Sequence, residues 1–159
     1  MATISFEGLD NVITLCEMTY RQTSKIVGRS IYPGAKVMLA AAEKATQSII
    51  TDSTHTSKMR VGPTEQQKQG LIESLGVAPI RRDDWGWNVK IGYDGYNGIV
   101  TKKYKKGQPN IMIARSVESG TSFMYPQHFM ERAVESTRKQ VEETIENTFY
   151  EEIKAIWDR

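Results

Sequence analysis

Apolar residues recur every three or four positions through residues 130–156 of the chain. This spacing predicts an amphipathic helix that starts near Pro126 and reaches Trp157. At about 1.5 Å per residue such a helix is roughly 48 Å long, which is more than the core of a small domain requires. We therefore expect part of its apolar face to pack on another subunit. The face comprises Met130, Val134, Thr137, Val141, Ile145, Phe149, Ile153 and Ile156.

The N-terminal part of the chain predicts a short strand and two helices. Residues 3–6 are β-prone, and Asp10 or Asn11 can cap a helix that follows. Gly28 is a typical helix terminator, so the first helix is expected to end there. A second, alanine-rich helix is expected after Pro33, because proline suits the start of a helix better than its interior.

The middle of the chain contains the clearest strand pattern. Trp87, Val89, Ile91 and Tyr93 alternate with polar residues or glycine, which is the period of a half-buried strand. A helical turn is expected near residues 71–75, whereas residues 110–120 fit a strand or a helix equally well. Helices at both ends with strands between them indicate an α+β fold: two N-terminal helices, a small mostly antiparallel sheet and a long C-terminal helix.

The length of 159 residues fits a single domain over residues 1–159, with flexible loops near 51–68 and 94–110. Cys16 is the only cysteine, which excludes an intrachain disulfide and fits a reducing cytoplasm. It lies in the apolar stripe of the first predicted helix, so we expect it to pack in the core. We find no signal-peptide pattern and no apolar run long enough to span a membrane.

Few residues have the spacing of a catalytic or metal site. His55 lies in a polar loop without a second ligand at helical spacing. His128 is expected in the first turn of the last helix, where the positive helix end favours a neutral imidazole. Asp83 and Asp84 are adjacent, so on a strand they point to opposite sides and make poor acid–base partners. We therefore expect no catalytic residue, cofactor or metal, and a protein that is not an enzyme.

Charge is unevenly distributed along the chain. Residues 81–106 carry seven basic and three acidic side chains, whereas residues 130–159 carry five basic and eight acidic ones. Lys102, Lys103, Lys105 and Lys106 surround Tyr104, and such a cluster either contacts phosphates or keeps a loop solvated. The basic middle and the acidic terminal helix could also complement each other between neighbouring copies, where charge would guide register.

The segment before the last helix has the composition of a sharp corner. Gly120 allows a backbone conformation closed to other residues, Thr121 or Ser122 can bond to nearby amides, and Pro126 fixes its own φ angle. Phe129 then packs the start of the helix. Docking of the helix accounts for this segment without catalysis.

The same residues resemble a motif of the head–tail joining, or tail-completion, proteins of long-tailed bacteriophages of the lambdoid type. In that family an E-x-G-T segment precedes a P-x-F-x-x-x-A start of the last helix. The matching residues here are Glu118, Gly120, Thr121, Pro126, Phe129 and Ala133. The opening ISFEGLDNVITL is similar to the family's first strand, turn and helix, so the resemblance covers both ends of the chain.

The resemblance implies a structural subunit of the virion neck. It predicts a homo-oligomeric ring, commonly of six copies, that joins neighbouring neck and tail proteins and lets genomic DNA pass. Such a protein is made in the host cytoplasm and ends at the head–tail junction. The alternatives are a tail terminator that caps the tail tube, or a small nucleic-acid-binding module that uses the loop at residues 102–106.

Overall fold

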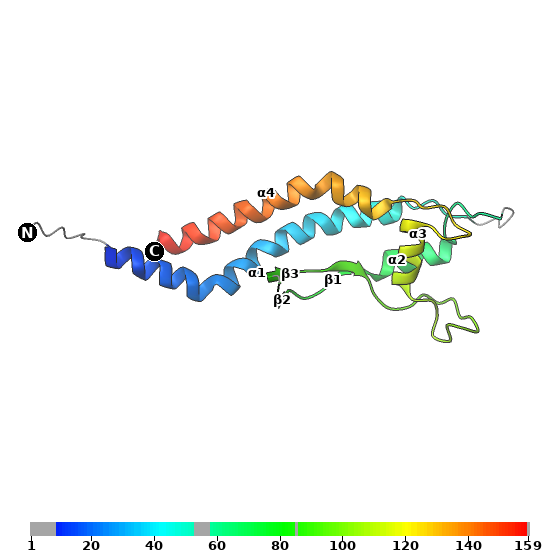
Figure 1. Ribbon diagram of the computed structural model, residues 1–159, viewed down its shortest axis with the longest axis horizontal. Helices are drawn as coiled ribbons and strands as arrows, with labels where there is room; N and C mark the ends of the chain where they lie inside the picture. The colour runs from blue at the N-terminus through cyan, green and yellow to red at the C-terminus, as the bar shows by residue number, and fades with distance from the viewer. Residues whose placement is uncertain (1–8, 53–57, 85, 159) are drawn as a thin grey trace, which may run out of the picture.

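The computed structural model describes residues 9–52, 58–84 and 86–158. Two long helices form an antiparallel arm, the shorter helices gather around one end of it, and the short strands run back beside the arm (Figure 1). The long helices are α1 (Leu9–Gln47) and α4 (Phe129–Trp157). The strand predicted at residues 3–6 and the loop residue His55 lie outside the described residues.

The predicted layout of the N-terminal region is wrong, because α1 is one continuous helix of 39 residues. Gly28 and Pro33 both lie inside it. A glycine in a helix interior costs only about 1 kcal/mol, and a proline removes one hydrogen bond and bends the helix without ending it. Figure 1 shows α1 bent along its length. Packing along α4 therefore outweighs two local signals for an interruption.

The packing of α1 on α4 is antiparallel along the arm. Met38 lies beside Thr137, whose hydroxyl is 3.5 Å from the Met38 sulfur. Further along, the Arg29 guanidinium pairs with Glu152 at 2.9 Å. At the far end the indole nitrogen of Trp157 donates to the Thr19 hydroxyl at 3.2 Å. The first turns of α1 therefore extend beyond the last turn of α4.

Cys16 lies in this N-terminal part of α1 and is exposed, so the prediction that it packs in the core is wrong. The apolar stripe that contains it continues past the end of α4, and the described chain supplies no helix to cover it. Val12 and Ile13 are each half exposed, and Tyr20 is 83% exposed.

The hydrophobic core lies at the other end of the arm, where α1 ends and α4 begins. Helix α2 (Glu65–Ser74) and helix α3 (Asn110–Ser119) close this end. A capping box between Thr64 and Gln67 fixes the start of α2. The fully or nearly buried residues here are Ile49, Leu71, Tyr93, Ile113, Ala114, Val117, Met124 and Phe129.

The predicted single sheet is also wrong, because the strands form two separate antiparallel pairs. Strand β1 (Leu75–Val77) pairs with β4 (Ile91–Tyr93), and Leu75 lies opposite Tyr93. Strand β2 (Arg81–Asp83) pairs with β3 (Gly86–Asn88). The alternating segment thus divides between β3 and β4, since its two halves pair with different partners.

The remaining predictions are resolved in part. Residues 110–119 form a helix, which decides between the two interpretations of that segment. The predicted loop at 51–68 is shorter than expected, because α2 begins at Glu65. Whether the loops near 51–68 and 94–110 are flexible stays a prediction. No helix in the described part of the chain has the length and apolar character needed to cross a membrane.

Candidate assembly site

The corner between α3 and α4 places the motif residues in one hydrogen-bonded unit. Helix α3 ends at Ser119, and the φ of 73° at the capping residue Gly120 is positive, which glycine tolerates. A Cβ on Gly120 would lie 2.9 Å from both the Met124 oxygen and the Pro126 ring. Thr121 and Met124 then close a tight turn, with the Thr121 amide donating to the Met124 oxygen at 2.9 Å. The close turn accounts for glycine at position 120.

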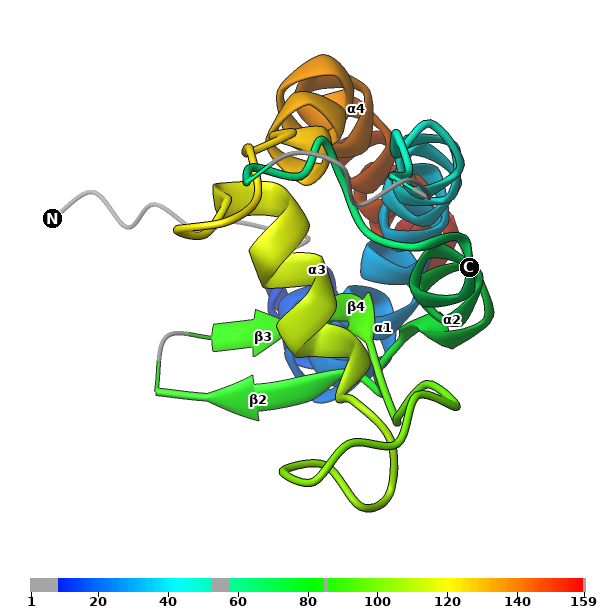
Figure 2. The same cartoon turned by 90° about the vertical axis from the view of Figure 1, so that its right-hand side faces the viewer.

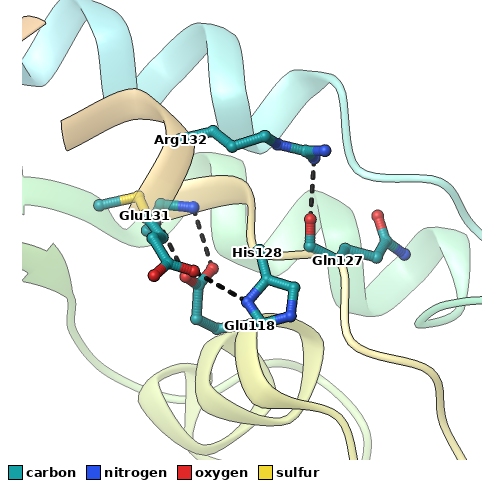
Figure 3. A network of polar contacts seen from close by, with 6 residues as sticks. Glu118, Gln127, His128, Glu131 and Arg132 are labelled. Atoms are coloured by element: carbon teal, nitrogen blue, oxygen red, sulfur yellow. Dashed lines mark hydrogen bonds and ion pairs between the residues drawn. The ribbon is translucent and has the colours of Figure 1, made fainter. Parts of the chain in front are cut away.

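Glu118 binds the first turn of α4 from the end of α3. Its two carboxylate oxygens accept hydrogen bonds from the backbone amides of Met130, at 2.9 Å, and Glu131, at 3.0 Å (Figure 3). The amides at a helix start have no partner within the helix, and a carboxylate also complements the positive end of the helix dipole. Glu118 therefore caps α4 through a tertiary contact, which no local sequence pattern indicated.

Pro126 and His128 lie before α4, which corrects the expectation that they belong to its first turn. The helix begins at Phe129, and His128 is the residue that precedes it, with a left-handed backbone at φ 45°. The His128 side chain makes no capping hydrogen bond. Its Nδ1 atom lies 3.0 Å from the Glu131 carboxylate instead. The charge state of His128 stays a prediction.

Gln127 connects the corner to the end of α1. Its side-chain oxygen accepts from the Ile50 amide at 2.9 Å, and its side-chain nitrogen donates to the carbonyls of Ile50 and Val61. The Gln127 carbonyl accepts from the Arg132 guanidinium at 2.8 Å (Figure 3). Nothing in the sequence indicates this role of Gln127, because an amide that joins three distant segments has no periodic or spacing signature.

Phe129 anchors the corner in the core. It is 2% exposed, and its ring centroid lies 6.4 Å from that of Tyr93. The Tyr93 hydroxyl lies 2.6 Å from the Thr46 hydroxyl of α1. Burial raises the pKa of Tyr93 above its usual value, the hydrogen bond with Thr46 opposes this effect, and the Glu118 carboxylate adds to it. Phe129 and Tyr93 therefore hold α1, β4 and α4 together.

Glu118, His128 and Glu131 are grouped closely enough for one ligand atom from each to face a common ion. Both Glu118 oxygens already accept backbone hydrogen bonds, and the start of α4 repels a cation. The cluster is thus accounted for as the cap of a helix.

The 94–110 loop, which carries the four lysines, extends away from the arm (Figure 2). Lys102, Lys103, Lys105 and Lys106 are all exposed, and Tyr104 between them is half-buried, with its hydroxyl donating to the Met112 sulfur. The Lys103 ammonium lies 5.4 Å from the centre of the Tyr104 ring. The structure brings the four predicted lysines together, and it places them apart from the corner.

A groove with a volume of about 730 Å³ runs between α1 and α4. Its described lining contains alanines with Lys36, Lys44 and Arg132, and it includes no carboxylate, imidazole or thiol. The charged groups in the described lining of the groove are therefore all cationic.

Comparison of the chain with protein-family models, with curated proteins and with solved structures finds no match.

Proposed function

We propose that this chain is a structural subunit of the head–tail connector, or neck, of a long-tailed bacteriophage. In this role it forms a ring that completes the tail or joins it to the head, and genomic DNA passes through the ring. Its partners are other copies of itself and the neighbouring neck and tail proteins. It acts by assembly, and it is not an enzyme.

The observation that carries the proposal is the construction of the corner. Glu118, Gly120, Thr121 and Phe129, which carry the resemblance to tail-completion proteins, together orient α4 along α1. A motif that shapes the subunit in this way suits a protein whose task is to present surfaces to neighbours.

The two-helix arm supports an assembly role on physical grounds. Outside the core, α1 and α4 pack mainly on each other, so each leaves apolar side chains in contact with solvent. Tyr20, Tyr150 and Trp157 are 83%, 62% and 52% exposed. Aromatic residues in such positions are typical of surfaces that other proteins cover.

Electron microscopy of a phage that lacks this gene tests the proposal. Free, DNA-filled heads beside tails of normal length are expected if the protein joins the two. Overlong tails would assign it to termination of the tail tube. Intact, infectious virions would overturn a structural role in the neck.

A second candidate is a nucleic-acid-binding module, which the exposure of all four loop lysines favours. In that case the protein binds a labelled DNA duplex at low salt, and replacement of the four lysines by glutamine reduces the salt dependence of the affinity. Lack of binding at low salt would exclude this candidate.

A further inference from the structure

The 94–110 loop holds its lysines on a defined scaffold. The Asn97 side-chain oxygen accepts from the amides of Ile99 and Gln108, at 3.0 and 3.1 Å, and the Asn97 amide donates to the Gln108 carbonyl. Gly107 has a φ of 97°, and a Cβ there would collide with the backbone carbonyl oxygen of Asn97. Asn97 is 6% exposed. The two ends of the loop are therefore fastened together below the lysine-bearing tip.

The surface of this tip is both basic and apolar. We define the lysine tip as Val100, Lys102, Lys103, Lys105 and Lys106. Val100 is 66% exposed, and Tyr96 near the base of the loop is 59% exposed. In the described chain the four lysines have no carboxylate within ion-pair distance. A charge of +4 beside exposed apolar side chains suits an acidic partner that also carries apolar groups.

The C-terminal half of α4 has the complementary composition. Residues 140–153 contain five glutamates and no lysine or arginine. We define the acidic stripe as Glu142, Glu146, Phe149 and Tyr150, which lie on one side of the helix by their spacing. Phe149 is 36% exposed and Tyr150 62% exposed. Within the described residues, neither Glu142 nor Glu146 has an ion-pair partner.

The lysine tip and the acidic stripe cannot meet within one chain. The tip extends from the end of the molecule where α2 and α3 lie, whereas the C-terminal half of α4 lies along the opposite part of the arm (Figure 1). A contact between different surfaces of two copies is heterologous, and such contacts propagate into a ring when the rotation closes.

We propose that the lysine tip of one copy docks on the acidic stripe of the next copy, and that this contact sets the register of the assembly. The inference rests on the proposed function and names the interface within the ring. Val100 lies beside the lysines as Phe149 and Tyr150 lie beside the glutamates, so apolar contact accompanies the ion pairs. DNA phosphates would pair with the lysines but would give the exposed valine no apolar contact. The half-buried Tyr104 donates its hydroxyl hydrogen bond to the Met112 sulfur, so this hydroxyl is not directed toward a base.

Charge exchange between the two surfaces tests the interface. The tip variant carries Lys102→Glu, Lys103→Glu, Lys105→Glu and Lys106→Glu. The stripe variant carries Glu142→Lys and Glu146→Lys. A control variant reverses four other exposed lysines: Lys25, Lys36, Lys44 and Lys90. The mass of each full-length protein is measured by light scattering over a range of concentrations at low salt, with circular dichroism to establish folding.

The wild-type and control proteins are expected to assemble above the 18.0 kDa of one chain. The tip variant and the stripe variant are each expected to need at least about tenfold higher concentration to assemble. An equimolar mixture of the two is expected to assemble again, because each then offers the other an opposite charge. Recovery in the mixture cannot come from a variant that fails to fold.

Three results would overturn the interface. They are a wild-type protein that stays monomeric throughout, a tip variant that assembles like the wild type, and a mixture that does not recover. If the tip variant assembles normally but loses binding to a DNA duplex, the partner of the lysines is nucleic acid. Electron micrographs of the phage that lacks this gene test the neck function separately. The proposed interface can therefore be disproved without disproving that function.

Discussion

Gly34 of α1 lies directly against Ile145 of α4, and a Cβ added at Gly34 would be 2.5 Å from the Ile145 Cγ1 atom. The absence of a side chain therefore lets the two helices of the arm approach closely. Gly28, in the same helix, has no atom within 4 Å of an added Cβ. The two glycines thus differ in what surrounds them while sharing the same helical conformation.

Replacement of each glycine by alanine is expected to have opposite effects. Gly28→Ala should stabilise the protein by about 0.5–1 kcal/mol, because alanine favours the helix. In Gly34→Ala the same gain is opposed by overpacking against Ile145, which costs about 1–3 kcal/mol. Urea denaturation of both variants measures the difference. Equal stabilisation by both substitutions would mean that the arm is not closely packed at Gly34.

Removal of the Glu118 carboxylate is expected to weaken the start of α4. Glu118→Ala leaves the amides of Met130 and Glu131 without an acceptor and should cost about 0.5–2 kcal/mol. Glu135→Ala removes an exposed glutamate from α4 itself and serves as the control. Hydrogen exchange at the two amides should accelerate only in the Glu118 variant. Unchanged exchange there would contradict the capping role.

Tyr93 is expected to make stability depend on alkaline pH. Because burial raises its pKa in the folded protein, the folded state retains the phenol proton at a pH where the unfolded chain loses it. This contribution is fully present below about pH 10, the usual pKa of tyrosine, and is lost as the pH rises from there through the raised pKa.

The variant Tyr93→Phe should remove this alkaline loss of stability. At neutral pH it should cost about 1 kcal/mol through the lost hydrogen bond with Thr46. Tyr20→Phe, which alters a side chain that is 83% exposed, is the matched control. Thermal denaturation between pH 8 and roughly pH 11, a range that brackets the usual tyrosine pKa, measures the effect. An alkaline slope that persists in Tyr93→Phe would assign it to another group.

Gly107→Ala is expected to distort the lysine tip without unfolding the protein. The positive φ and the contact with the Asn97 oxygen both oppose a side chain at this position. Gly98→Ala, in the same loop, meets only the end of the Gln66 side chain at 3.4 Å. Amide chemical shifts of residues 97–108 should change much more in the Gly107 variant. Similar spectra for both variants would show that the loop adapts freely.

The sequence indicated those features that depend on local periodicity and missed those that depend on distant partners. The apolar repeat of residues 130–156 predicted α4 because much of one face of that helix packs on α1, although Val134 and Phe149 of the repeat stay exposed. Gly28 and Pro33 are genuine local signals for an interruption, but α4 supplies enough contact to keep α1 continuous. The alternation from Trp87 to Tyr93 is real, yet nothing in it shows that its halves pair with different strands.

The candidate site follows the same division. The glycine conformation at position 120 and the burial of Phe129 followed from the types of residue in the corner. The roles of Glu118 and Gln127 did not, because their partners lie on other elements. Four clustered lysines were evident in the sequence, whereas the Asn97 scaffold that presents them required the three-dimensional structure.

The pairing of α1 with α4 also has a consequence for synthesis on the ribosome. Arg29 and Glu152 are 123 positions apart, so α1 emerges from the exit tunnel long before the helix that covers it has been translated. The apolar side of α1 that faces α4 therefore stays uncovered until α4 has been synthesised. The arm thus closes only after α4 has been synthesised, and nascent copies on one polysome expose the same uncovered apolar helix to one another.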